Sequence, residues 1–505
     1  MAKALKNRAS KQSYVSDRQM TIAGFETPFS KNLRADNRWV ELAHKIPWDT
    51  LVGVYIVNMR NESTGADGIN PRVAIGAMII KHMCDLSDRE TVQQIQENMY
   101  MQYFIGYAGF SDEAPFDPSL FVNFRKRLGI DQINAINEKI LGLHVSDEED
   151  GPPPSIGGPT GTGHSPAPVT HKGKLITDAT ACPQDIAYPT DLDVLNDARG
   201  KSQHIIDLLY HVKKHKVKPR TYRKIARKDY LRTAQKKTKT KKEIHQAVKK
   251  QLSYLKRNIN HINRLLDTYP TIPLHKKQYK YLLVIQTVYH QQQYMYNNRV
   301  NSVDHRIVSI HQPHVRPIVR GKANAKVEFG AKINVSLMNG YAFLDKLSWE
   351  AFNEGQFLIP AVEKYKQRFG YYPEEVMADK IYCTRSNRNA LKERHIKLRA
   401  KPLGRPKAVG VEHVRPGERN PIEGKFGQAK TAYGMNRIKA RLQQTSQSWI
   451  ATIILVLNLV KLAGEASFAL LLKHLTFSAR VVLTSGWEIF HENFAYGKNQ
   501  VALAA

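Results

Sequence analysis

The sequence predicts a multidomain protein: a helical N-terminal domain followed by an α/β core that carries a long basic helical insertion. Three observations lead to this fold class. Apolar residues recur at helical spacing over residues 37–144. Short apolar, β-branched stretches lie on both sides of residues 200–300, and that intervening segment is helical in pattern and strongly basic. At 505 residues the chain is also too long for one hydrophobic core.

The N-terminal part divides into an arm and a helical domain. Residues 1–36 carry scattered Lys and Arg with little periodicity, which predicts a basic flexible arm or, alternatively, an ordinary frayed terminus. Residues 37–144 contain several short helices, and the last of them, in FVNFRKRLG, is basic. The overall charge favours a helix-turn-helix DNA-binding domain, and a plain helical oligomerisation module is the alternative.

Local signals fix where two of these helices begin. LSDRETVQQI begins with a capping box from Ser87 to Glu90. FDPSLF has Asp117 as N-cap and a proline at the first helical position, and it places Phe116 to pack on Phe121.

The boundaries of the linker, the core, the insertion and the C-terminal tail follow from composition. Residues 145–174 are rich in Pro, Gly and Ser and predict a linker. The α/β core is expected over 175–199 and 301–475, interrupted by a basic helical hairpin over 200–300. Residues 476–505 form the expected C-terminal tail.

The insertion holds most of the positive charge. Between Arg199 and Arg299 there are 26 Lys and Arg against four acids, so +22 of the chain's formal +31 lies there. Apolar residues at steps of three and four predict one long helix, and TYPTIP at 268–273 predicts the turn into a second. Ten of the 23 tyrosines lie in this segment and either contact nucleic acid or pack the hairpin. With a pI near 9.8, the charge predicts a polyanionic partner, with nucleic acid as the first candidate.

Other protein classes are disfavoured. The most apolar stretch, 449–472, is interrupted by Asn458, Lys461 and Glu465, so it predicts a buried core helix rather than a membrane span. No secretory leader or lipidation signal is recognisable. Three cysteines without a CxxC pair indicate neither disulfides nor a zinc site and fit a reducing cytoplasm.

The core contains two strands that each run into an aspartate. KLITDATA reaches Asp178 and EEVMADKIY reaches Asp379, and neighbouring strands of an α/β sheet present such residues at one edge. Between them, two alternating stretches flank a turn at Asn339-Gly340, and residues 355–368 predict a helix. Paired carboxylates favour a hard divalent ion such as Mg²⁺, and two ions can activate a nucleophile and stabilise the leaving oxygen of a phosphodiester.

Glu423, in RNPIEGKFGQAK, is the candidate third carboxylate. Asn420 as N-cap with a proline after it would make the glutamate part of a capping box, which explains it by helix stability alone. The phosphate-binding interpretation rests on Lys430, seven residues on and on the same helix face, and on Arg419 as a bidentate phosphate clamp. Gly424 and Gly427 would allow close approach of a sheet or a DNA backbone.

These residues resemble the DDE transposases of bacterial insertion sequences, which have a ribonuclease-H-like catalytic core. The family's aspartate after a first strand matches Asp178, and its second aspartate, closely followed by a tyrosine, matches Asp379 with Tyr382. The pattern Tyr-x2-Arg-x3-Glu-x6-Lys matches at Arg419, Glu423 and Lys430, whereas Pro416 stands at its tyrosine and Ile381 stands where the second motif often has glycine. Residues 37–130 resemble the helical domain that accompanies such cores.

The resemblance implies binding to terminal inverted repeats, metal-assisted cleavage that frees a 3′-hydroxyl, and joining of that end to target DNA. It implies two Mg²⁺, with Mn²⁺ as a substitute, held by Asp178, Asp379 and Glu423. Phosphate or DNA contacts are expected from Arg419, Lys430, Lys425, Tyr382 and Lys380. It also implies a homodimer or larger assembly on double-stranded DNA, in the cytoplasm at a bacterial nucleoid, with no membrane partner.

Two alternatives use the same residues differently. A ribonuclease-H-like nuclease or resolvase would hydrolyse DNA without strand transfer. A catalytically inactive DNA-binding protein derived from a transposase would keep the charge and have no need of the carboxylates.

Overall fold

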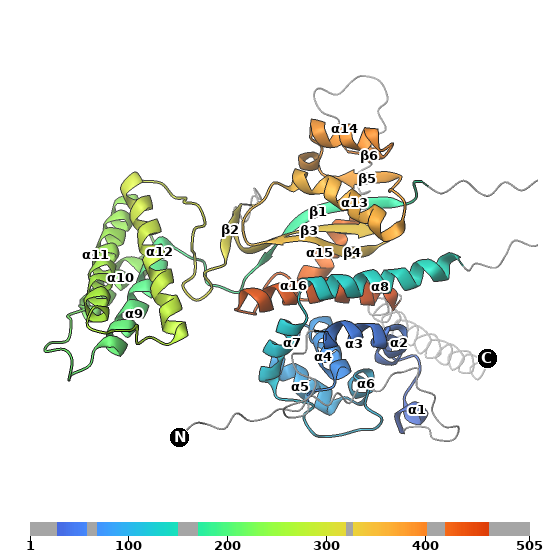
Figure 1. Cartoon of the computed structure of the whole chain (residues 1–505), viewed down its shortest axis with the longest axis horizontal. Coiled ribbons are helices and arrows are strands. Elements are labelled where there is room, and N and C mark those ends of the chain that lie inside the picture. Colours follow the sequence, from blue (N-terminus) through green and yellow to red (C-terminus); the bar gives the residue numbers. More distant parts are fainter. Residues whose placement is uncertain (1–27, 58–67, 150–169, 320–326, 401–419, 464–505) are drawn as a thin grey trace, which may run out of the picture. The chain divides into compact units, whose positions relative to one another are not determined.

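A computed structural model of the protein (Figure 1) describes residues 28–57, 68–149, 170–319, 327–400 and 420–463. The chain forms two compact units. The first contains residues 1–161, 340–342 and 452–505, and the second contains 162–339 and 343–451.

The first unit is helical. Its elements up to residue 149 are α1 Pro28–Asn32, α2 Arg38–Lys45, α3 Trp48–Ile56, α4 Pro71–Met83, α5 Asp88–Glu97, α6 Met99–Phe104, η1 Pro118–Leu120, α7 Phe121–Arg127 and α8 Ile130–Glu149. Helix α4 is apolar on every side and almost entirely buried, so the other helices pack around it as a central element.

The helix-start signals in the sequence are confirmed. Ser87 Oγ accepts a hydrogen bond from the Glu90 backbone N–H at 3.1 Å, the N-cap half of the predicted capping box. Asp117 Oδ1 caps η1 by accepting from the Ser119 N–H at 2.8 Å. Phe116 packs on Phe121 with ring centroids 5.3 Å apart, as a hydrophobic staple requires.

Three details of this unit differ from expectation. Residues 28–32 of the expected flexible arm form α1, in which Phe29 is buried. Helix α8 continues through residues 145–149, because VSDEE contains no helix breaker before the prolines of GPPP, so the linker cannot begin at 145. Arg125 of the basic helix α7 is buried and paired with Asp88, so its charge lies within the fold.

The second unit is built on a six-stranded mixed sheet. Its strands are β1 Lys174–Pro183, β2 Arg316–Val319, β3 Val327–Met338, β4 Tyr341–Ser348, β5 Glu375–Ala378 and β6 Lys397–Arg399. They follow the order β2-β3-β1-β5-β6, with β4 also paired to β3. β1 runs antiparallel to β3 and parallel to β5, and β5 runs parallel to β6.

The remaining core elements follow from local sequence. The β3–β4 turn has positive φ at Asn339 and Gly340, 50° and 79°, as predicted for an Asn-Gly hairpin. The predicted helix at 355–368 is the short turn η2 Glu354–Phe357 followed by α13 Leu358–Phe369. After β5 come η3 Lys380–Tyr382, α14 Arg385–Glu393 and, beyond β6, α15 Asn420–Thr431.

The basic insertion has four helices, where the sequence predicted a two-helix hairpin. They are α9 Asp191–Leu209, α10 Arg223–Ala234, α11 Lys241–Leu266 and α12 Lys276–Asn298. The predicted pair is α11 and α12, which run side by side with α9 and α10 packed against them (Figure 1). The pair alone would expose its apolar face, and apolar residues of α9 such as Leu195, Ile206 and Leu209 cover it.

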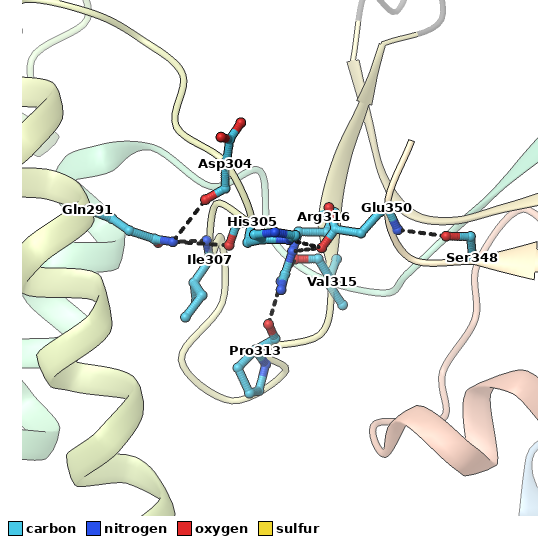
Figure 2. A network of polar contacts seen from close by, with 9 residues as sticks. All are labelled: Gln291, Asp304, His305, Ile307, Pro313, Val315, Arg316, Ser348 and Glu350. Carbon is cyan, nitrogen blue, oxygen red and sulfur yellow. Dashed lines mark hydrogen bonds and ion pairs between the residues drawn. The ribbon is translucent and has the colours of Figure 1, made fainter. Parts of the chain in front are cut away.

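The segment between α12 and β2 ties the insertion to the sheet (Figure 2). Glu350, just after β4, accepts hydrogen bonds from His305 Nδ1 at 3.0 Å and from Arg316 Nε at 2.8 Å. Gln291 of α12 accepts from the Ile307 N–H at 3.0 Å and donates to the His305 carbonyl at 3.1 Å. One carboxylate of the core and one amide of the insertion therefore hold the same loop.

Helix α16, Gln443–Leu462, confirms the predicted buried helix over residues 449–462, whereas residues 464–472 of that stretch and the expected tail at 476–505 lie outside the described residues. It is the one helix in the described part of the chain that is long and apolar enough to cross a membrane, and 89% of its most apolar window is buried within the protein. Asn458, which interrupts the apolar stretch, accepts from the Ala342 N–H at 2.7 Å and donates to the Ala342 carbonyl at 2.8 Å. The Asn458 amide thus provides hydrogen-bond partners for the backbone N–H and carbonyl of Ala342 in the β3–β4 hairpin.

Candidate active site

The sheet register brings the two candidate aspartates to the same edge. The parallel pairing of β1 with β5 ends at Thr177 opposite Ala378, so Asp178 and Asp379 are the next residues of neighbouring strands. β1 itself does not end at Asp178, as the sequence suggested, but continues to Pro183. It continues because β3 pairs with it on the other side as far as Gly330.

Helix α15 brings Glu423 to the same place. Asp178, Asp379 and Glu423 line one cavity of about 590 Å³ in the second unit. From α15 the lining also includes Phe426, Gly427 and Lys430. Offsets of three, four and seven from Glu423 define one face of a helix, so the predicted shared face of Glu423 and Lys430 is present.

Backbone N–H groups orient the two aspartates. Asp178 Oδ1 accepts from the Ala179 N–H at 2.8 Å, and Asp379 Oδ1 accepts from the Lys380 N–H at 2.7 Å. Asp379 is also the N-cap of η3, so its carboxylate is held at the point where the chain leaves the sheet. A carboxylate can accept several hydrogen bonds or metal contacts beyond one such bond.

The donor chemistry of this cavity suits a hard divalent cation, because carboxylate oxygens are the ligands that Mg²⁺ prefers. The carboxylates are nevertheless not drawn together around one point. Among the residues that the structure describes, no three His, Cys, Asp or Glu side chains converge closely enough to hold one ion.

Two further charged residues of the cavity were not predicted. Lys332 of β3 forms an ion pair with Glu354 of η2 at 2.7 Å, and both side chains line the cavity. Lys332 Nζ also donates to the Phe352 carbonyl at 2.9 Å. In the sequence Lys332 is a single lysine within an alternating strand and Glu354 lies in a turn, so neither carried a recognisable signal.

Tyr382 requires a correction. Its side chain has no exposed surface, so in this structure it cannot make the expected contact with DNA. Its hydroxyl donates to Asn334 Oδ1 at 2.6 Å, and Asn334 Nδ2 donates to Thr177 Oγ1 at 3.2 Å. Burial raises the pKa of Tyr382 and keeps the phenol protonated as a donor. Because Thr177 precedes Asp178 in the chain, this buried network links the segments that carry the two aspartates.

The other predicted contacts lie outside the cavity or outside the described residues. Arg419 is among the residues that the structure does not describe. Lys425 and Lys380 are on α15 and η3 but are not part of the cavity lining. Asn420 is already inside α15, where the sequence predicted it as the N-cap. A Cβ added at Gly424 or Gly427 would meet no atom within 4 Å, so neither glycine serves close packing on the sheet.

The comparisons with known proteins bear on both units. The family described as Transposase DDE domain matches residues 376–460, a span that includes Asp379, Glu423 and Lys430. The family described as Transposase domain (DUF772) matches residues 28–127 in the helical unit. The chain belongs to the DDE transposases.

A curated relative agrees with this assignment. An uncharacterized protein, ORF8 in the nfe locus of Rhizobium meliloti, is 30% identical over 198 residues. That match covers 38% of this chain and 82% of the relative. No solved structure matches the chain. Transposases of this kind act on DNA and use divalent metal ions, which agrees with the basic charge and with the carboxylates of the cavity.

Proposed function

We propose that this transposase binds the terminal inverted repeats of its own insertion sequence, hydrolyses a phosphodiester at each end, and joins the freed 3′-hydroxyl to target DNA. The observation that carries the proposal is the shared cavity, which Asp178, Asp379 and Glu423 reach from two strands and one helix. Strand order β4-β3-β1-β5-β6, with β3 antiparallel and β5 parallel to β1, supports a ribonuclease-H-like core.

Each side chain has a role in this proposal. Asp178 and Asp379 would share one Mg²⁺ and Glu423 would hold a second, with Mn²⁺ as a substitute. The bound ions would activate the nucleophile and offset the charge of the phosphate. Lys430, on the same helix face as Glu423, grips a phosphate oxygen, and Arg419, Lys425 and Lys380 add cationic contacts around the cavity. Tyr382 is a positioning residue that holds the aspartate-bearing segments in register.

The chemistry consists of two displacements at phosphorus. In the first, the oxygen of water forms a bond to phosphorus while the bond to the 3′-oxygen breaks, which leaves a 3′-hydroxyl and a 5′-phosphate. In the second, that 3′-oxygen attacks a target phosphodiester and displaces a 3′-oxygen of the target, so the number of phosphodiester bonds is conserved. We propose that two or more subunits pair the element ends on double-stranded DNA at the nucleoid.

The proposed domain organisation assigns these steps to parts of the chain. The helical unit contributes to DNA binding, the sheet with α15 carries out cleavage, and the basic insertion holds DNA through its charge. The insertion has the strongest support of the DNA-contacting parts, because +22 of the formal charge of +31 falls between Arg199 and Arg299.

The decisive experiment is a nicking and joining assay with Mg²⁺ or Mn²⁺ on a supercoiled plasmid that carries the gene with its native flanks. Asp379→Asn should lower cleavage by at least roughly a thousand-fold and leave DNA affinity equal or tighter, because a negative charge near phosphate is removed. Glu374→Gln is a matched control, since that exposed carboxylate lies at the opposite end of the strand that precedes Asp379.

The products distinguish the alternatives. Cuts at fixed flanking positions with joined products support a transposase, and cuts without joining support a hydrolytic nuclease or resolvase. If wild type binds the plasmid and cuts nothing, the protein is a DNA-binding derivative and the proposed function is wrong.

A further inference from the structure

A second cavity, of about 530 Å³, lies in the helical insertion between α9, α10 and the loop that precedes β2. Its lining is strongly basic and includes a single acid, Asp197. The Lys and Arg side chains of the lining are Arg199, Lys201, Arg223, Lys224 and Arg227. An anion would therefore meet a net positive charge from several directions.

Hydrogen bonds fix the buried arginine in the lining of this cavity. Arg199 is only 4% exposed, and its guanidinium donates to Gln251 Oε1 at 3.0 Å and to Asn196 Oδ1 at 2.6 Å. Gln251 is fixed in turn by donating to the Ala226 carbonyl of α10 at 3.0 Å. An arginine held in this way at the cavity wall loses little conformational freedom when a ligand binds.

Gln203, one turn along α9 from Arg199, indicates which kind of ligand the cavity would bind. Its side chain lines the cavity and is 7% exposed, and its Nε2 has no hydrogen-bond partner within the described part of the chain. A buried amide donor without a partner is costly, and buried polar groups in native proteins are normally satisfied. A ligand with acceptor oxygens would satisfy Gln203 and the cations together.

The charged groups facing the site favour an anion. Asp207 accepts from Lys218 Nζ at 2.8 Å and from Arg223 at 3.0 Å, so its negative charge is neutralised at the side of the cavity. Burial raises the pKa of Asp197, the one acid in the lining, although the charges of His311 and Lys201 oppose this shift. Arg223, Lys224 and Arg227 lie exposed on α10, which leaves the rim open to a large ligand.

We propose that this cavity binds a backbone phosphate of duplex DNA, with Gln203 and Arg199 contacting the phosphate oxygens and Arg227 lying at the rim. The inference rests on the proposed function, in which the insertion holds DNA, and assigns that contact to named residues. Contacts to phosphate fix the position of a duplex without reading its sequence. The site therefore contributes affinity that is independent of the bases.

A neighbouring cavity is lined by cations and by one acid, Glu350, which is paired with Arg316. It shares His311 with the first cavity and is lined by Lys280, Arg316 and Arg441. Trp349 in its lining is 7% exposed, and its indole N–H has no acceptor among the described residues.

The test measures binding of the full-length protein to a labelled DNA duplex of random sequence by fluorescence anisotropy over a series of salt concentrations. Arg227→Gln should weaken binding about tenfold at low salt and reduce the slope of log K against log salt by about 0.9, the value for one phosphate contact. Lys392→Gln, which also removes one positive charge but at an exposed lysine of α14 outside the insertion and the cavity, should change the affinity and the salt slope by less than half of the changes expected for Arg227→Gln.

Gln203→Leu separates ligand binding from folding. Because the variant removes a buried donor that lacks a partner, its thermal stability should equal or exceed that of wild type, while its DNA affinity should fall about threefold with no change in salt slope. A variant that loses stability and keeps its affinity would make Gln203 a structural residue and overturn the assignment.

The remaining outcomes are also decisive. If Arg227→Gln and Lys392→Gln behave alike while wild type binds and cuts DNA, the cavity assignment fails and the proposed function stands. If wild type does not bind DNA at all, the proposed function itself fails. Saturable binding of inorganic phosphate that is lost in Arg227→Gln, with DNA affinity unchanged, would assign the cavity to a small phosphate ligand and overturn the DNA assignment.

Discussion

At the scale of single residues, Tyr382 shows how one spacing in a sequence can correspond to two different roles. A tyrosine three residues after the candidate aspartate Asp379 was expected to contact DNA, but the turn η3 directs this one inward. There it bonds to Asn334, and Asn387 Nδ2 donates to its carbonyl at 2.8 Å. The position of the hydroxyl depends on β3, which is distant in sequence, so no local pattern predicts it.

Tyr382→Phe tests this positioning role. Removing the hydroxyl leaves Asn334 Oδ1 buried without its donor, which should lower the free energy of unfolding by about 1–3 kcal/mol, measured by urea denaturation. Cleavage should slow because the segment that carries Asp379 is less well held, while DNA affinity should be unchanged. A fall in DNA affinity with unchanged stability would restore the DNA-contact interpretation. Tyr188→Phe, at a largely exposed tyrosine, is the control.

The carboxylates themselves were predictable because each had a local reason to be noticed. Asp178 and Asp379 follow apolar strand segments, and Glu423 stands out in a basic neighbourhood. That they line one cavity depends on the register of β1 with β5 and on the face of α15. Lys332 and Glu354 lacked any such local signal, since their pairing brings together β3 and η2 through the fold.

At the scale of elements, the caps and turns were predictable because they depend on neighbouring residues. The Asn339-Gly340 turn, the Ser87 and Asp117 caps and the long helix α11 all appear as expected. The extra helices of the insertion were missed because α9 begins within a segment expected to belong to the core. The apolar face of α9 packs in one cluster with those of α11 and α12, and that packing is a tertiary property.

Helix α15 offers a matched pair of glycines. Gly427 lines the cavity and Gly424 does not, and a methyl group at either position meets open space. Each Gly→Ala change should raise the free energy of unfolding by up to about 1 kcal/mol through helix propensity. We expect Gly427→Ala alone to slow DNA cleavage, because its methyl group narrows the space between Glu423 and Lys430.

Thermal unfolding and the plasmid cleavage assay measure both effects. Equal cleavage by the two variants would mean that the DNA backbone does not approach this face of α15. Loss of stability in both variants would mean that the helix contacts a neighbour that the glycines accommodate.

At the scale of the whole molecule, the distribution of charge was the most informative property of the sequence. The excess of Lys and Arg predicts a polyanionic partner, and its concentration between Arg199 and Arg299 predicts that the insertion binds it. The loop between α12 and β2 was not predictable, because it depends on Glu350, which lies 45 residues after His305 and 34 after Arg316 and accepts hydrogen bonds from both. This loop determines how the basic helices are held against the sheet within the second unit.

Glu350→Gln tests whether that connection couples DNA binding to cleavage. The substitution removes the charge that holds His305 and Arg316, so the insertion should still bind DNA but orient it less well over the cavity of Asp178 and Asp379. We expect DNA affinity within about twofold of wild type and cleavage reduced about tenfold, since misorientation costs rate rather than binding. Limited proteolysis between residues 299 and 315 should also become faster.

The same carboxylate predicts a pH dependence. Although burial opposes ionisation, the hydrogen bonds from His305 and Arg316 lower the pKa of Glu350. A lowered carboxylate pKa contributes stability that is present above the unfolded value of about 4.3 and is lost as pH falls through the lower folded value. Wild type should therefore lose more stability than Glu350→Gln on acidification below about pH 4.3.

Glu363→Gln is the matched control, because Glu363 also accepts from an arginine Nε at 2.8 Å, from Arg394, and that ion pair lies away from the loop. If Glu363→Gln reduces cleavage as much as Glu350→Gln, the effect is a general loss of core stability. If only Glu350→Gln uncouples cleavage from binding, the insertion acts as an oriented arm of the catalytic core, and its attachment is as important to the reaction as its charge.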